Sequence, residues 1–237
     1  MLVRDKKHFT TGAAMAMTFI GLFILILSPV FGGGMNGLEY ADDIFNKLSK
    51  GSSYFIPKLV KGTEKTMGKQ INVTISYDSP EDAQRTAGLL SAAGATVQQQ
   101  GGTLSVSGDL GNMLMVVLKD SENMYRNEGD KVKSVYGYDE RKVMKDWWTA
   151  LNKTDKALQN AKQFALAKAI ADVVKKGVEP SYNFYQIQPQ NVTDRVGTMA
   201  GLLVFYVVYT IWWGYALYHL FEGLGLTTKK VKVKKEL

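Results

Sequence analysis

The residues best suited to chemistry are an ionisable pair near the end of a long apolar segment. His219 and Glu222 are three positions apart, so on a helix they share one face. Ionisable side chains inside or at the edge of a membrane span are rare and often functional, for example in a proton relay, a lipid-headgroup contact or a polar contact with a partner helix. The alternative is an interfacial position, where partial hydration makes both side chains inexpensive. His219 and Glu222 therefore form a candidate polar membrane site.

Other catalytic and metal-binding chemistries find little support in the sequence. The chain has no cysteine and two histidines, His8 and His219, which excludes thiol nucleophiles and cysteine-based zinc or iron–sulfur sites. A haem held by one histidine would need its second axial ligand from another subunit. Adjacent acids have a simpler role on solvated faces or at helix N-termini, where negative charge is favourable. The pairs are Asp42-Asp43, Glu81-Asp82 and Asp139-Glu140. We predict no catalytic residue, no cofactor, no metal and no enzymatic activity.

Two uncharged segments are long enough to cross a bilayer. Residues 9–38 and 196–221 contain no Asp, Glu, Lys or Arg, and a spanning helix needs about 20 apolar residues. We predict membrane-spanning helices at residues 11–31 and 196–222. Pro29 and the glycines after it end the first helix, since they continue helices poorly. A cleaved signal peptide is the alternative for the first segment, although no convincing small-x-small cleavage site follows it.

Small residues on both segments predict close packing of helices. Gly197 and Gly201 form a GxxxG motif, which lets two helix backbones approach closely. A complementary stripe on the first segment includes Ala14, Thr18 and Gly21. Packing between the two spans of one chain is the simplest use of the motif, and packing against another subunit is the alternative.

The charged tails predict the orientation of the two spans. Residues 1–10 and 223–237 are rich in lysine and arginine and carry most of the formal net charge of +7. Positive charge beside a span favours the cytoplasmic side. We therefore expect a hairpin in a cell membrane with both termini cytoplasmic and residues 32–195 extracytoplasmic. Nucleic acid is not an expected partner, because the basic residues do not cluster on a folded domain.

The segment between the spans has the pattern of an α/β domain. Apolar and polar residues alternate at 70–77, which is the period of a half-buried strand. Serine, proline and two acids at 79–82 are typical of a helix start. Further strands are predicted at 95–99, 103–107 and 131–136, with a second helix after Asp109. The order is βαββαβ over residues 70–137, which is that of the ferredoxin-like sandwich.

Helical segments flank this domain on both sides. Residues 38–48 have amphipathic helical spacing, which suits a position on the membrane or against the domain. A run of lysines follows, which could lie against anionic lipid headgroups or in a solvated loop. These lysines are Lys47, Lys50, Lys58, Lys61, Lys65 and Lys69. Residues 139–176 predict a helical hairpin or a long kinked helix, with a break near 152–155 and an end at Gly177 and Pro180.

The expected organisation is that of a membrane α+β protein. Its segments are a cytoplasmic tail (1–10), the first span (11–31), an amphipathic helix and basic linker (32–69), the extracytoplasmic domain (70–137), a helical hairpin and linker (138–195), the second span (196–222) and a second cytoplasmic tail (223–237). The tails are too short to fold, which leaves little for signalling. We expect a non-catalytic, membrane-anchored accessory or scaffold subunit that contacts either other membrane proteins or copies of itself, and also the lipid bilayer. The alternative is a self-associating envelope organiser that binds cell-wall or surface polysaccharide, since the order of segments resembles in topology that of the polysaccharide co-polymerases.

Overall fold

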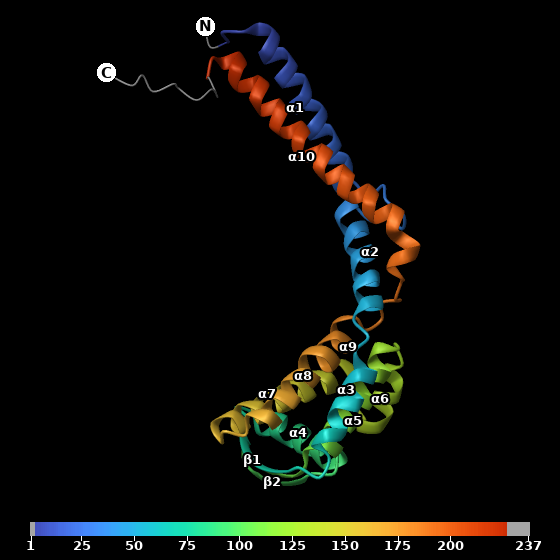
Figure 1. Cartoon of the computed structure of the whole chain (residues 1–237), viewed down its shortest axis with the longest axis vertical. Helices are drawn as coiled ribbons and strands as arrows, with labels where there is room; N and C mark the ends of the chain where they lie inside the picture. The colour runs from blue at the N-terminus through green and yellow to red at the C-terminus, as the bar shows by residue number, and fades with distance from the viewer. Residues whose placement is uncertain (1–2, 227–237) are drawn as a thin grey trace, which may run out of the picture. The chain divides into compact units, whose positions relative to one another are not determined.

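The computed structural model of the protein describes residues 3–226, which form two compact units. The first unit combines the two ends of the chain, up to Phe45 and from Asn191 onward, and the second comprises Asn46–Gln190. Each unit has its own set of helices (Figure 1). The C-terminal lysines at positions 229–235, which support the predicted second cytoplasmic tail, lie outside the described residues.

Helices dominate both units, and the described strands form one small sheet. The first unit contains α1 (Lys6–Leu27), η3 (Val192–Arg195) and α10 (Val196–Leu224), and α2 (Gly37–Ser52) leads from it to the second. The helices of the second unit are α3 (Ile56–Thr63), η1 (Glu64–Thr66), α4 (Pro80–Ala92), α5 (Leu110–Tyr125), α6 (Gly129–Tyr136), α7 (Glu140–Asn160), α8 (Phe164–Val173), η2 (Val174–Val178) and α9 (Glu179–Asn183). Its strands are β1 (Gln70–Ser76), β2 (Thr96–Gln100) and β3 (Thr103–Asp109).

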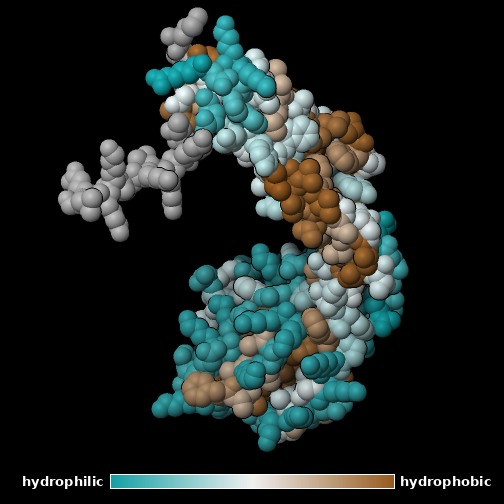
Figure 2. Space-filling view, turned by 45° about the horizontal axis from the view of Figure 1, so that its top comes forward, coloured by the Kyte–Doolittle hydropathy of each residue, from teal (hydrophilic) through white to brown (hydrophobic). Residues whose placement is uncertain are grey.

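Two long apolar helices, α1 and α10, make up most of the first unit. Both are long and apolar enough to cross a membrane, and almost none of their apolar length is buried within the protein. They lie side by side (Figure 1), and hydrophobic residues cover much of the visible side of the pair (Figure 2). The helices are antiparallel, because the backbone N–H of Arg4 donates to the carbonyl oxygen of Gly223 at 2.9 Å. Asp5 caps α1 by accepting from the backbone N–H groups of Lys7 and His8, so this helix begins before the predicted residue 11.

The second unit contains the expected first three strands. The sheet has the order β1-β3-β2, and both pairings are antiparallel, with Val73 opposite Val106. Alternate residues of β1 are buried, as the period of two predicts. Ser79 caps α4 and Asp109 caps α5 through their side-chain oxygens, which confirms both predicted helix starts.

The predicted fourth strand at 131–136 is wrong, because these residues belong to α6. Val132 and Tyr136 are four positions apart and both turn inward, which is helical spacing that also fits a short alternating strand. Gly137 closes the helix with a φ of +79°. The sheet of the described residues therefore stays at three strands, and the ferredoxin-like sandwich is not completed.

The helical region after α6 also differs from its prediction in detail. α7 runs without interruption through 152–155, and the break falls at 161–163, where Lys162 has a φ of +58°. α7 and α8 then pack against each other. Gly177 and Pro180 do not end the second helical run, which continues through η2 into α9. Pro180 lies in the first turn of α9, directly after the π turn of η2.

The core of the second unit lies between the sheet and the helices that cover it. α4 and α7 pack against the strands, while α5 packs against α3, α7 and α9. Trp147 of α7 is fully buried, and its indole Nε1 donates to Asp120 Oδ2 at 2.9 Å. Tyr136 donates to the same oxygen at 2.6 Å, which fixes α6 against α5. Burial raises the pKa of the Asp120 carboxyl, although both hydrogen bonds favour its charged form.

Candidate functional site

The two histidines of the chain meet between α1 and α10. Nδ1 of His8 and Nδ1 of His219 lie 2.9 Å apart, and the two rings are stacked with their centroids 5.1 Å apart. In this hydrogen bond one ring donates and the other accepts, and the tautomers of the two rings decide which is the donor. Tyr218 packs edge-on against both rings. The sequence pointed to His219 and gave no sign of a role for His8, because only the antiparallel pairing of the helices brings the two together.

Glu222 does not join the histidine pair. It lies one turn after His219, yet its Oε1 is buried and has no hydrogen-bond partner among the described residues. Within residues 3–226, no group of three or more His, Asp or Glu side chains is arranged to hold a metal ion. The arrangement is thus a two-histidine contact between helices with an acid beside it.

The close approach of α1 and α10 lies at glycines that the sequence analysis did not select. A Cβ at Gly12 would lie 2.6 Å from the backbone nitrogen of Leu220, and one at Gly223 would lie 2.6 Å from Cα of Phe9. Any side chain at either position would therefore push the two helices apart. Phe19 stacks on Tyr209 at 4.1 Å farther along the pair.

The predicted packing residues lie away from this contact. A Cβ added at Gly197, Gly201 or Gly21 would meet nothing within 4 Å, and Ala14 and Thr18 are exposed. The GxxxG motif therefore does not lie at the close contact of α1 with α10. The reason is the register of the two helices. Because they are antiparallel and His8 lies beside His219, α1 ends at about the level of α10 at which the motif begins. Packing of the motif against another subunit stays a prediction.

The acidic pairs of the second unit have the structural roles that were expected of them. Asp139 caps α7 by accepting from the backbone N–H of Lys142 at 2.9 Å, and Glu140 accepts from the Tyr185 hydroxyl at 2.9 Å. Glu81 and Asp82 lie in the first turn of α4. These contacts stabilise helix starts and inter-helix packing.

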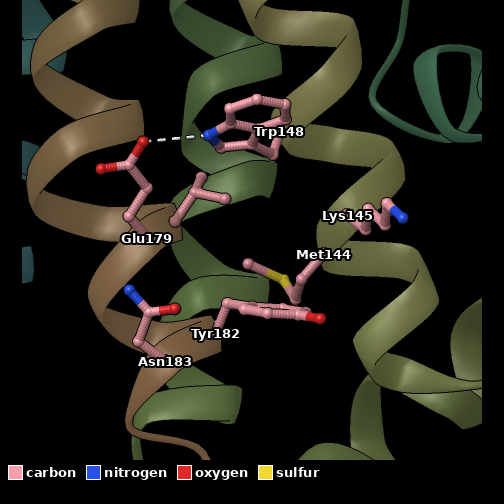
Figure 3. A pocket seen from close by; sticks show the side chains of 7 residues that line it. Met144, Lys145, Trp148, Glu179, Tyr182 and Asn183 are labelled. Carbon is pink, nitrogen blue, oxygen red and sulfur yellow. Dashed lines mark hydrogen bonds between the residues drawn. The ribbon is translucent and has the colours of Figure 1, made fainter.

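An exposed aromatic pocket lies in the second unit between α7 and the η2–α9 segment (Figure 3). Its volume is about 340 Å³, and its lining residues are Met144, Lys145, Trp148, Val178, Glu179, Tyr182 and Asn183. Trp148 is 43% exposed, and its Nε1 donates to Glu179 Oε1 at 2.9 Å, which holds the indole at one side of the pocket. The Tyr182 ring and the Met144 side chain lie together on the opposite side.

The π-helical segment η2 gives this pocket one of its walls. The backbone N–H of Glu179 donates to the carbonyl oxygen of Val174, five residues earlier, which widens the turn. A single π turn re-aims the side chains that follow it, and such turns are frequent at functional sites. The guanidinium of Arg141 lies 5.8 Å from the Tyr182 ring centroid, a cation–π contact that steadies the ring. The sequence did not indicate this pocket, because the helix was predicted to end at Gly177.

Lys50 is a buried residue and does not belong to a surface run of lysines. It has no exposed surface, and its Nζ donates to Asn127 Oδ1 at 2.8 Å and to the carbonyl oxygens of Phe184 and Ile187 at 3.0 and 2.7 Å. These partners are neutral, so burial lowers the pKa of Lys50 to about 8. The lysine therefore fastens the end of α2 to the segment that follows α9.

No protein-family model matches the chain, and comparisons with curated proteins and with solved structures find no significant match.

Proposed function

We propose that this protein is a non-catalytic, membrane-anchored accessory or scaffold subunit of a larger membrane protein complex. In this proposal α1 and α10 cross a cell membrane as a hairpin with both termini in the cytoplasm. The second unit is extracytoplasmic and contacts partner proteins. The observation that carries the proposal is the pairing of two long apolar helices that leave most of their apolar surface exposed.

The exposed surface of the helix pair supports a membrane location. Leu203, Val204 and Tyr206 of α10 are each more than 60% exposed, and many apolar neighbours are exposed with them. A soluble monomer rarely exposes so large an apolar patch, because water contact with it is unfavourable. A bilayer removes that cost, and it admits helices because their backbone hydrogen bonds are satisfied internally.

The charges at one end of the pair support the orientation. Arg4, Lys6 and Lys7 precede or begin α1, and the antiparallel packing places the C-terminal end of α10 beside them. Both chain ends of the hairpin then lie on the same side of the membrane. Positive charge on that side favours the cytoplasm.

Two features of the surface suit contacts with other subunits. The exposed Gly197 and Gly201 leave open space on one face of α10, which suits the close approach of a partner helix. The pocket at Trp148 suits a side chain of a partner protein, since tryptophan and tyrosine are enriched at the centres of protein interfaces.

The orientation can be tested by labelling, because the chain contains no cysteine. Ser134→Cys introduces a thiol at an exposed position of the second unit, and Lys7→Cys introduces one at the start of α1. A membrane-impermeant maleimide added to intact cells should label the first variant and spare the second until the membrane is permeabilised. Labelling of Lys7→Cys in intact cells would show that the orientation is wrong.

The subunit role can be tested by purification from native membranes in mild detergent, with quantification of the proteins that co-migrate. Trp148→Ala and Gly201→Leu should each lower the yield of partners about tenfold, because each alters an exposed residue at a proposed contact. Phe164→Ala is the control at an exposed aromatic outside the pocket, and it should change nothing. Recovery of the chain only with copies of itself would favour the self-associating envelope organiser.

A further inference from the structure

A second groove in the same unit has lysines on both of its walls. It lies between α3 and α8 and has a volume of about 650 Å³. Lys58, Lys65 and Lys69 line it from α3 and the residues after that helix, while Lys168 and Lys176 line it from α8 and η2. The first group belongs to the run of lysines visible in the sequence, whereas the second group lies about a hundred positions later in the chain and meets the first only in the folded protein.

The groove keeps a strong positive charge. Its lining contains five lysines and one acid, Asp172. Asp172 lies 2.8 Å from Lys176 Nζ and 3.5 Å from Lys168 Nζ, so it neutralises only the α8 wall. Among the described residues, the lysines at 58, 65 and 69 make no ion pair. Their ammonium groups are therefore available to an anion.

The floor of the groove is apolar. Leu59, Leu166, Ala169 and Val173 line it between the two lysine walls, and Phe55 is 43% exposed at its edge. Lysine stems extend such a floor, because their methylene groups lie along apolar surface while the ammonium groups stay in water. The combination suits a ligand with an anionic head and a hydrocarbon part. Arginine is absent from the lining, so the groove lacks the planar fork that would recognise one fixed phosphate geometry.

We propose that this groove binds an anionic phospholipid, with the phosphate between the lysines and an acyl chain along the apolar floor. Inorganic phosphate or a polyanionic polymer would satisfy the lysines and leave the floor in contact with water. An uncharged lipid would leave the lysines unpaired. The site lies apart from the aromatic pocket, and its occupation does not depend on the proposed partners or on the orientation of the helices.

The test uses the complete chain in an uncharged detergent. Ala165 is an exposed residue of the groove lining, and Ala165→Cys gives a single thiol for a fluorophore in this cysteine-free chain. The probe lipid is phosphatidylglycerol with a spin label on its acyl chain, which quenches the fluorophore when the chain enters the groove. Phosphatidylcholine with the same spin label measures quenching by detergent-solubilised lipid in general.

Phosphatidylglycerol should quench at a lipid concentration about tenfold lower than phosphatidylcholine, since each lysine near an anionic lipid adds to binding. The groove variant combines Lys58→Gln, Lys65→Gln and Lys69→Gln. The control variant combines Lys131→Gln, Lys133→Gln and Lys156→Gln, which remove the same charge at exposed positions outside the groove. The groove variant should lose the preference for phosphatidylglycerol, and the control variant should keep it.

Three outcomes would overturn the proposal. Equal quenching by the two lipids would show that the charge of the headgroup does not matter. An equal loss in both triple variants would show a general effect of net charge. Displacement of phosphatidylglycerol by inorganic phosphate at a similar concentration would show an anion site without a role for the acyl chain.

Discussion

The buried lysine at the end of α2 allows a stability prediction that can be worked out from its contacts. Lys50→Met keeps the length of the side chain and removes three hydrogen bonds from a charged donor, each worth about 1.5–3 kcal/mol. The substitution also removes the desolvation cost of the ammonium group. A pKa lowered from 10.5 to about 8 corresponds to about 3 kcal/mol of that cost. At pH 7 the variant should therefore lose about 1.5–6 kcal/mol of unfolding free energy.

The same lysine predicts the sign of a pH dependence. Between about pH 8 and pH 10.5 the unfolded chain keeps its proton on Lys50 while the folded protein has lost it. Because the unfolded state then binds more protons, raising the pH stabilises the wild type relative to Lys50→Met. The difference in unfolding free energy should grow by about 3 kcal/mol across this window and stay flat below it.

Urea unfolding of the full chain in an uncharged detergent measures both effects. Trp212→Phe and Trp213→Phe in every sample leave the fluorescence to the tryptophans at 147 and 148, which report on the second unit. Lys61→Met is the control at an exposed lysine, and it should change the unfolding free energy by less than about 0.5 kcal/mol. The reasoning is refuted if Lys50→Met is as stable as the wild type at pH 7, or if the difference is flat from pH 8 to pH 10.5.

Two further predictions concern polar contacts, one in each unit. His219→Leu should weaken the packing of α1 on α10 by about 1 kcal/mol, as measured by proteolysis of the hairpin in detergent. Adding His8→Leu should cost no more, because the two histidines share one hydrogen bond. Additive losses in the double variant would contradict the pairing. Asp120→Asn should abolish a pH dependence of stability. Burial raises the pKa of the Asp120 carboxyl above 3.8, so the folded state keeps this proton to a higher pH than the unfolded state. The stability that the protonated Asp120 contributes to the wild type is therefore lost as the pH rises through the folded pKa. Urea unfolding from pH 3.5 to pH 7 measures it, and a wild type that gains stability relative to the variant as the pH rises would oppose it.

Features that depend on neighbours in the chain could be predicted from the residue types alone. The caps at Ser79 and Asp109 act within one helical turn, so the residue types were sufficient to place both helix starts. The alternation around Val73 reflects burial of one face of β1, and it identified that strand. The two apolar helices follow from length and composition alone. The same local pattern failed at 131–136, where six residues fit a helix face and a strand equally well.

Contacts between residues far apart in the sequence could be seen only in the folded chain. His8 and His219 form a pair because two helices pack antiparallel in one register, and no local pattern contains that register. The same register leaves Gly201 exposed and places the close approach at Gly12. Lys50 is buried because carbonyl oxygens from a distant segment surround its ammonium group, although lysine is rarely found in a protein interior. Packing energies act through space, and so the sites of this protein arise where segments remote in the chain meet.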